Sequence, residues 1–478
     1  MMKLKSPLII SSLPGVLTAA VLWLVTLLRW DAAQYATQEM DALWQSAGID
    51  HLRDDPWGTL SVLHIQPPGM NALFALDLAL TPGSHALILG LNLVVMLATI
   101  VLIVDVLRRW GAARIVASGA GVAYALLPST VIYSQWVYSV SIIAFLSIAA
   151  IWGVSLYKTR PNTGAIVSGS AVALAALIRP SFTVPLALVW IVIWAVALLR
   201  RKGSRYLGGV IGLVAIAAAL VGVQVHYFAS FGLPAMSSWT GENLAKALQV
   251  SQSLNVTDSA RREIAASPCQ AQMLDAYEAG ALNRWDWQAF RNLPACAELP
   301  SLEARGVRAW DSPVKGSSTE GNFVYSERLV ASREWTQMMT TIIRHDPWQL
   351  LRMALTTDYG PRSSGLGLYL SPAEDYPFVQ QIRNAHPLAI PLGVWSLLFA
   401  PLAWSLVFLG VVLAGLRRDD ALQRSPVFWS AVALAAYHLG VNVLLEYSEN
   451  MRYRAEIDAV LLTAAALVIA SIHRRVRT

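Results

Sequence analysis

A series of long apolar runs constrains this chain more than any other feature of its sequence. Most of these runs approach or exceed the length, about 20 residues, that a helix needs to cross the hydrocarbon core of a bilayer. They cover residues 7–28, 86–107, 113–131, 137–156, 164–178, 183–199, 206–226, 390–416, 427–445 and 457–473. The chain is 55% hydrophobic and only 14% charged. It is thus more apolar and less charged than a typical soluble domain. We therefore expect a mainly α-helical, polytopic membrane protein with about ten transmembrane helices.

The apolar run at residues 70–80 is treated differently, because about 11 residues are too few to span a bilayer. It follows the segment His64-Ile65-Gln66-Pro67-Pro68-Gly69 and contains Asp77. Prolines are tolerated at the start of a helix. We expect a helix that lies on the outer membrane interface within the first outer loop.

Basic residues in the short loops fix the expected orientation. If 70–80 does not cross the membrane, every strongly basic short loop falls on one side, which is the cytoplasmic side by the positive-inside rule. These residues are Arg108, Arg109, Arg114, Lys158, Arg160, Arg200, Arg201, Lys202, Arg205, Arg417, Arg418, Arg424, Arg474, Arg475 and Arg477. We expect a multi-pass protein of the inner (plasma) membrane with both termini cytoplasmic. The net charge of +6 then reflects orientation, and no nucleic-acid partner is expected.

The polar stretches divide the chain into three parts. We expect an N-terminal transmembrane module at 1–226, with a first outer loop at 29–85, and a C-terminal transmembrane module at 390–478. Between them, 227–389 is expected to form an extracytoplasmic soluble domain, helical because 241–254 and 322–355 have helical periodicity. Its two cysteines, Cys269 and Cys296, predict a disulfide in an oxidising compartment. Two unpaired thiols are the alternative.

The segment Trp30-Asp31-Ala32-Ala33-Gln34-Tyr35 directly follows the first apolar run. Asp31 is thereby placed where a membrane helix ends and water begins, and a carboxylate at that depth is often functional. The alternative is an interfacial Trp-Asp pair that caps the end of a helix.

Three arginines stand in short outer loops, where they oppose the orientation rule: Arg179, Arg452 and Arg454. A guanidinium matches a phosphate with two parallel hydrogen bonds. We predict that these arginines bind a lipid phosphate. The alternative is a structural ion pair with Asp31, Glu446 or Glu449.

The chain lacks the familiar cofactor motifs. It has no Gly-Lys-Ser/Thr phosphate loop, no Gly-x-Gly-x-x-Gly, no His-Glu-x-x-His and no cysteine spacing of the metal-binding type. No metal ligands are predicted and no cofactor is indicated, although a divalent cation is left open.

Taken in order, the motifs resemble a known family. They are Asp31-Ala32-Ala33-Gln34-Tyr35, Pro67-Pro68-Gly69, the stretch from Pro128 to Ser134, Leu177-Ile178-Arg179-Pro180 and Arg452-Tyr453-Arg454. The chain resembles the GT-C glycosyltransferases, and among them the bacterial branch similar to family 39, which includes protein O-mannosyltransferases and the aminoarabinose transferase of lipid A. The large outer domain matches nothing in the resemblance.

Two positions depart from the family pattern. The family often has an acidic residue just after the Tyr-Ser stretch, where this chain reads Tyr138-Ser139-Val140-Ser141. A second acidic role would then fall to Asp54, Asp55 or Glu449. The usual proline after Arg-Tyr-Arg is replaced by Ala455 and Glu456.

The resemblance implies transfer of a sugar from a polyprenyl-phosphate donor at the outer face of the membrane, with inversion. It implies Asp31 as the base that takes the acceptor proton, and Arg454, Arg452 or Arg179 as stabilisers of the phosphate leaving group. The acceptor would be a cell-envelope glycan, a glycolipid or a protein hydroxyl. Residues expected to line the substrate site are Tyr35, His64, Gln66, Trp57, Asp54, Asp55, Tyr453 and Glu449.

Two other functions remain open. A transporter or flippase of lipid-linked saccharides would place ionisable residues near the bilayer midplane, whereas this chain gathers them at the outer ends of its spans. A non-catalytic scaffold that binds through the outer domain is the third reading.

Overall fold

The computed structural model describes residues 17, 20, 21, 43–82, 85–134, 136–201, 206–233, 236–250, 253–316, 321–355, 366, 370, 389–416, 419–445 and 454–477. Within them every named element is a helix. The β pairing found there is one isolated antiparallel bridge between Val314 and Gly321. The expectation of a mainly helical chain is confirmed.

Six helices in the described part are long and apolar enough to cross a membrane. They are α5 (Ala86–Arg109), α9 (Pro161–Ile178), α11 (Leu207–Phe231), α22 (Ala389–Gly415), α24 (Pro426–Leu445) and α26 (Asp458–Arg477). Two further apolar helices, α8 (Val140–Ser155) and α10 (Val184–Leu199), have 16 residues each. These helices establish a multi-pass membrane protein. The first expected span, 7–28, lies outside the described residues except at 17, 20 and 21, so the count of ten stays a prediction.

The expected span at 113–131 is wrong as a single helix. The chain forms α6 (Arg114–Ala125), breaks at Leu126 and Leu127, and begins a short second helix, α7 (Pro128–Ser134). Pro128 explains the break, because a proline has no backbone N–H to continue a helix and is tolerated only in its first turn.

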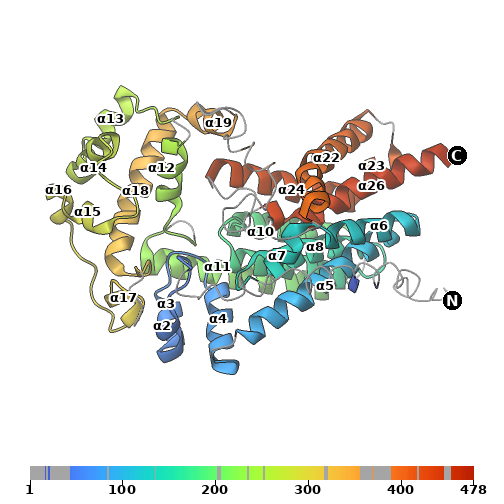
Figure 1. Cartoon of the computed structure of the whole chain (residues 1–478), viewed down its shortest axis with the longest axis horizontal. Helices are drawn as coiled ribbons and strands as arrows, with labels where there is room; N and C mark the ends of the chain where they lie inside the picture. Colours follow the sequence, from blue (N-terminus) through green and yellow to red (C-terminus); the bar gives the residue numbers. More distant parts are fainter. Residues whose placement is uncertain are drawn as a thin grey trace.

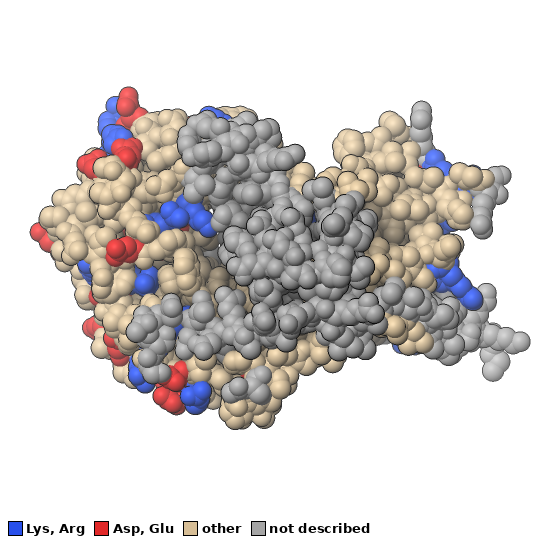
Figure 2. All heavy atoms as spheres, viewed as in Figure 1, with Lys and Arg blue, Asp and Glu red and all other residues tan. Residues whose placement is uncertain are grey.

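The apolar helices form one bundle, and a second group of helices lies at one end of it (Figure 1). We call this second group, residues 240–355, the helical domain, and the adjoining end of the bundle the domain end. Figure 2 shows charged side chains over the helical domain and at the opposite end of the bundle, with few on the described surface between them. A band of low charge between two charged ends is what a bilayer requires.

Contacts at the far end of the bundle unite the basic loops, as the orientation rule predicts. Arg474 lies over the Trp110 ring at 3.8 Å, and the Trp110 Nε1 donates to Ser425 Oγ at 2.9 Å. The loop after α10 is tied to the end of α8, since Arg201 donates to the Tyr157 carbonyl at 2.9 Å. The two sets of loops are linked in turn, because the Trp152 Nε1 near the end of α8 donates to Asp105 near the end of α5 at 2.7 Å, so these basic loops share one end of the bundle.

The helix expected on the membrane interface is α4 (Gly69–Leu80), which crosses the direction of α5 in Figure 1. Its 12 residues span only about 18 Å, too short to cross the hydrocarbon core. Asp77 of α4 is fully buried and accepts hydrogen bonds from the backbone N–H groups of Leu87 and Ile88. It therefore caps α5 and fixes the turn between the two helices.

The helical domain has a core of its own. Its elements are α12 (Thr240–Val250), α13 (Asp258–Ile264), α14 (Pro268–Glu278), α15 (Trp287–Arg291), α16 (Pro294–Ala297), α17 (Arg308–Asp311), α18 (Ser326–His345) and α19 (Trp348–Leu355). Leu244 and Leu248 of α12 pack with Trp335 and Met338 of α18 at its centre. The expected boundary at 226/227 falls inside α11, which continues to Phe231. A separate helix, α19, begins just after Pro347.

A disulfide joins Cys269, on α14, to Cys296, on α16, as expected. Both cysteines are buried in the domain core. The bond closes a loop with a sequence separation of 27 residues.

Replacing both cysteines with serine is expected to destabilise the helical domain by about 3–4 kcal/mol, because the unfolded chain regains the entropy of the open loop. Denaturant unfolding followed by tryptophan fluorescence, with and without a reductant, measures the change. Equal midpoints for the oxidised protein, the reduced protein and the double variant would contradict it.

Glu242 is an acidic residue buried in the helical domain. It lies in the first turn of α12, is 4% exposed, and accepts a hydrogen bond from Ser332 of α18. Burial raises its pKa from an ordinary 4.5 to about 8, although Ser332, Arg328 and Arg284 each favour the charged form. Between a pH of about 4.5 and about 8, Glu242 thus keeps a proton in the folded state that it loses in the unfolded state.

The stability of the domain is therefore expected to fall as the pH rises from about 4.5 to about 8, by a few kcal/mol in all. Glu242→Gln, which cannot ionise, should flatten this dependence and unfold at a higher temperature than the wild type at pH 8. The exposed Glu298→Gln is the matched control. Parallel pH profiles for the wild type and Glu242→Gln would refute the assignment.

Candidate functional site

The segment that precedes α4 lies between the bundle and the helical domain. His64 is fully buried; its Nε2–H donates to the Val324 carbonyl at 3.0 Å and its Nδ1 accepts from the Ser238 hydroxyl at 2.9 Å. Burial lowers the pKa of His64 to about 3, so the ring is neutral. His64 therefore joins the first outer loop to the helical domain through hydrogen bonds. Its part in lining a sugar site stays a prediction.

The Pro-Pro-Gly motif packs on the end of α9. A Cβ added at Gly69 would lie only 2.6 Å from the Leu177 carbonyl oxygen. Only glycine allows the first loop to approach this closely. The motif thus brings the first loop against the residues that immediately precede Arg179.

Arg179 is the centre of a buried hydrogen-bond network formed by Gln66, Tyr138, Arg179, His438 and Glu456. The Arg179 Nε donates to Glu456 Oε1 at 2.6 Å, and its Nη1 donates to Tyr138 Oη at 2.7 Å. Tyr138 in turn donates to Gln66 Oε1 at 3.5 Å, and His438 Nε2 lies 3.4 Å from Glu456 Oε2. We call this set the Arg179 network. It joins five segments that are far apart in the sequence.

The centre of the Arg179 network is an ion pair between Arg179 and Glu456. Arg179 and Glu456 are 1% and 0% exposed. Burial by itself would raise the pKa of Glu456, but Arg179 and His438 outweigh it and hold that pKa below its usual range. Glu456 is therefore ionised and depends on Arg179.

Arg454 is buried in the same region. Its Nε donates to Asp458 Oδ1 at 3.1 Å, and both side chains are 1% exposed. Arg179 and Arg454 thus each have a carboxylate partner, and neither partner is one of the three acids considered from the sequence. Their binding of a donor phosphate stays a prediction.

The other candidates in the first loop are placed at its surface. Trp57, on α3 (Pro56–Ser61), is 81% exposed. Asp55 accepts from the Gly58 backbone N–H at 2.9 Å and so caps α3. Asp54, the last residue of α2 (Ile49–Asp54), is exposed and lies 3.8 Å from Arg308. Asp54 and Asp55 thus have structural contacts of their own.

The remaining candidates fall on residues outside the described part. They are Asp31, Tyr35, Glu446, Glu449, Arg452 and Tyr453. Their predicted roles are unchanged.

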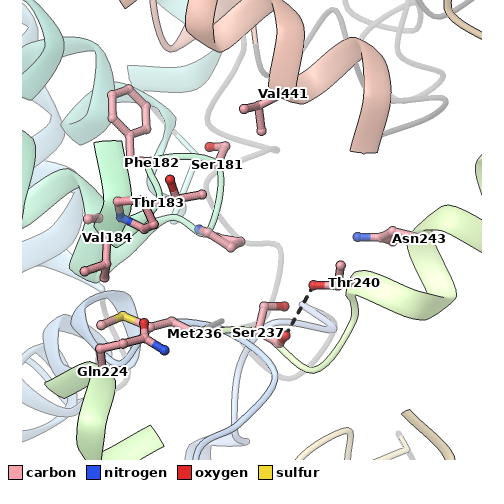
Figure 3. A pocket seen from close by; sticks show the side chains of 13 residues that line it. Ser181, Phe182, Thr183, Val184, Gln224, Met236, Ser237, Thr240, Asn243 and Val441 are labelled. Atoms are coloured by element: carbon pink, nitrogen blue, oxygen red, sulfur yellow. Dashed lines mark hydrogen bonds between the residues drawn. The ribbon is translucent and has the colours of Figure 1, made fainter. Parts of the chain in front are cut away.

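A cavity of about 240 Å³ opens beside the Arg179 network, between the bundle and the helical domain. Its walls come from the loop after Arg179, from α11, from the start of α12 and from α24. Figure 3 shows Thr240 and Asn243 on one side, facing Ser181, Phe182 and Thr183 on the other. The lining includes the polar side chains of Ser181, Thr183, Gln224, Ser237, Thr240 and Asn243.

The cavity is connected to both parts of the candidate site. Ser237 in its wall donates to the Ile65 carbonyl at 2.7 Å, beside His64 and Gln66. Phe182 in its opposite wall packs on the His438 ring at 5.6 Å between centroids. A small polar molecule in the cavity would thus lie close to the first loop and to the Arg179 network.

An apolar groove of about 520 Å³ runs between α10 and α24. Its walls include Val189, Ile193 and Trp194 from α10, and Trp429 and Leu434 from α24. The same two helices contribute Val184 and Val441 to the polar cavity. The polar cavity and the apolar groove are therefore both bordered by α10 and α24.

Sequence analysis missed three members of the network. Tyr138 and Glu456 entered only as departures from the family pattern, and His438 not at all. An ionisable residue inside an apolar run is itself a signal of a functional site, and this signal would have found His438. No local sequence pattern indicates that Glu456 pairs with Arg179, since 277 residues separate them.

Among the described residues, no group of three or more His, Cys, Asp or Glu side chains is arranged to hold a metal ion.

No protein-family model and no curated protein matches the chain. Two solved structures are similar to it across 95% of its length. The crystal structure of ArnT from Cupriavidus metallidurans bound to undecaprenyl phosphate shares 13% identity, with 77% of that chain covered and a TM-score of 0.31. ArnT from the same organism in the apo state shares 14% identity, with 76% covered and a TM-score of 0.29. Similarity at this level supports no transfer of fold or activity to this chain.

Proposed function

We propose that this protein is a GT-C type glycosyltransferase of the inner membrane, which moves a sugar from a polyprenyl-phosphate donor to an acceptor hydroxyl. The reaction takes place at the domain end of the bundle, on the outer face of the membrane. One observation carries the proposal: a polar cavity beside the buried Arg179 network and an apolar groove are both lined by residues of the membrane helices α10 and α24.

A donor with a polar head and a long apolar tail suits this arrangement. The sugar occupies the polar cavity, where Ser181, Thr183 and Asn243 offer hydrogen bonds. The polyprenyl tail lies in the groove between α10 and α24, whose walls are mostly apolar. The phosphate lies between the two, at the level of the helix ends.

The reaction is a displacement at the anomeric carbon. Asp31 takes the proton of the acceptor hydroxyl, and the acceptor oxygen bonds to the anomeric carbon from the face opposite the phosphate. The bond to the phosphate oxygen breaks with its electron pair, the configuration inverts, and polyprenyl phosphate leaves. Arg454, Arg452 and Arg179 balance the charge that develops on the leaving phosphate.

Transfer itself is tested with the purified protein in liposomes, supplied with polyprenyl-phosphate sugars and cell-envelope extracts as acceptors. A labelled sugar should appear on the acceptor while free polyprenyl phosphate accumulates. A transporter would instead move the intact donor between leaflets, so donor that changes leaflet without cleavage would overturn the proposal. Loss of a sugar from envelope glycans or lipids after gene deletion, seen by mass spectrometry, would identify the product.

The role of Arg454 in binding phosphate gives a sharper prediction. Arg454→Lys should raise the donor concentration for half-maximal rate by roughly tenfold or more, because a point charge cannot replace the guanidinium fork. An ion pair with Asp458 alone would tolerate lysine and would show its effect in folding yield. Donor titrations in liposomes measure the difference.

Arg475→Lys is the matched control, because Arg475 pairs with Asp419 at the far end of the bundle. It should leave the donor titration unchanged. If Arg454→Ala keeps the wild-type donor affinity and rate, Arg454 is not the phosphate ligand, and Arg179 becomes the better candidate.

A further inference from the structure

The helix α19 is held to the helical domain by one of its faces. Met353 on that face is fully buried in the domain core. Gln349 is buried as well; it donates to the Ile342 carbonyl at 3.2 Å and accepts from the Asn255 backbone N–H at 3.3 Å. Because these contacts fix α19 on the domain, the side chains on its opposite face point away from the domain core.

The opposite face of α19 is apolar and exposed. Trp348, Leu351 and Leu355 are 67%, 45% and 50% exposed, and their spacing of three and four residues places them on one side of the helix. Arg352 lies on the same side, where it pairs with Asp346 at 2.5 Å. We call Trp348, Leu351, Arg352 and Leu355 the α19 face. Apolar side chains combined with a tryptophan and an arginine are typical of a helix that lies on a membrane interface.

The position of α19 along the bundle matches such an interface. α19 contacts the membrane helix α24, and Figure 1 shows it beside the domain end of that helix, with α4 across the bundle at a similar level. α4 exposes apolar side chains too, since Leu76 and Leu80 are 48% and 62% exposed. Two helices on opposite sides of the bundle thus expose apolar side chains at one level, as the flat surface of a bilayer requires.

The α19 face fits a lipid surface better than another protein. The helix has 8 residues and is only about 12 Å long. A stable protein interface needs roughly 20–30 residues on each side, whereas this face offers Trp348, Leu351, Arg352 and Leu355. Insertion into a bilayer needs no such area, because every apolar side chain that leaves water contributes separately.

We propose that the α19 face binds the phospholipid surface at the domain end of the bundle and anchors the helical domain to the bilayer. Its apolar side chains insert at the boundary between headgroups and acyl chains. The Arg352 stem lies along them while its guanidinium reaches the lipid phosphates. α12, which contacts α19, carries Thr240 and Asn243 of the polar cavity, so the lipid contact holds this wall of the cavity at a fixed height above the membrane.

The depth of α19 can be measured on the full-length protein, in nanodiscs of phosphatidylethanolamine and phosphatidylglycerol. A nitroxide is attached to Leu351→Cys and, as the matched control, to Arg262→Cys on the exposed surface of α13. Collisions with oxygen, which concentrates among acyl chains, and with a water-soluble nickel chelate give the depth of each label. The label on Leu351→Cys should lie about 5–10 Å into the boundary between headgroups and acyl chains, and the label on Arg262→Cys should lie in water.

Two results would overturn the lipid contact. One is a label on Leu351→Cys that meets the nickel chelate as often as the control does, since the face is then in water. The other is a label shielded from both reagents, since protein, either a segment of this chain or a second copy, then covers the face. As a second test, Leu351→Glu should move a label on Leu355→Cys toward water, whereas Arg262→Glu should leave it in place. No donor or turnover is needed, so the outcome is independent of the proposed function.

Discussion

Asp31→Asn is expected to lower the rate of sugar transfer by a factor of about 10²–10⁴, the usual contribution of a general base. The asparagine keeps the shape of the side chain and removes its ability to take a proton. Asp31 directly follows the first apolar run, within the segment Asp31-Ala32-Ala33-Gln34-Tyr35. Initial rates in liposomes at saturating donor, with the amount of folded protein matched by size-exclusion chromatography, measure the effect.

Asp420→Asn makes the same chemical change at the far end of the bundle, where Asp420 is largely exposed. It should keep the wild-type rate. An Asp31→Asn variant with near-normal turnover would remove Asp31 as the base and leave that role to another acid.

Arg179→Met is expected to destabilise the folded protein by about 3–5 kcal/mol, because it leaves Glu456 ionised and buried without its partner. The two side chains are 1% and 0% exposed, so water cannot replace the lost interaction. The Tyr138 hydroxyl loses the same donor. The apparent unfolding temperature and the yield of monodisperse protein in detergent report the loss.

The double variant Arg179→Met/Glu456→Met separates stability from function. Replacing both members of a buried ion pair with apolar side chains is often neutral for stability, so the double variant should recover most of the loss. If Arg179 serves only the fold, the recovered protein transfers sugar normally. If Arg179 also binds the donor phosphate, the recovered protein stays impaired at low donor concentration. A single Arg179→Met variant as stable as the wild type would contradict the pairing.

The Arg179 network also bears on the two departures from the family pattern. No carboxylate follows the Tyr-Ser stretch, but Tyr138 at that position holds Arg179. The carboxylate that neutralises Arg179 comes from Glu456, at the place after Arg-Tyr-Arg where proline is usual. A carboxylate is thus supplied to the region from another segment of the chain. We expect Glu456, more than Asp54 or Asp55, to carry any second acidic role, because those two lie at the surface.

Several features of this protein follow from the sequence alone. Apolar length predicts the bundle, since a run near 20 residues has no stable place outside a membrane. The 12 residues of α4 are too few to cross it, and the basic loops gather at one end as their spacing indicates. The pairing of Cys269 with Cys296 follows from their being the chain's two cysteines. These predictions succeed because each depends on local composition, on length or on simple counting.

Other features depend on contacts between distant segments, for which the sequence holds no local signal. Arg179 was recognised as unusual, but its partners Tyr138 and Glu456 lie 41 and 277 residues away. No local pattern indicates that the packing of the helical domain buries His64 between Ser238 and Val324, and its predicted part in lining the substrate site stays a prediction. A buried charge or ring must find a partner, but which partner depends on how the helices pack. The sequence therefore determined that this is a helical membrane protein with charged groups at the helix ends, and the tertiary structure decided which of those groups meet.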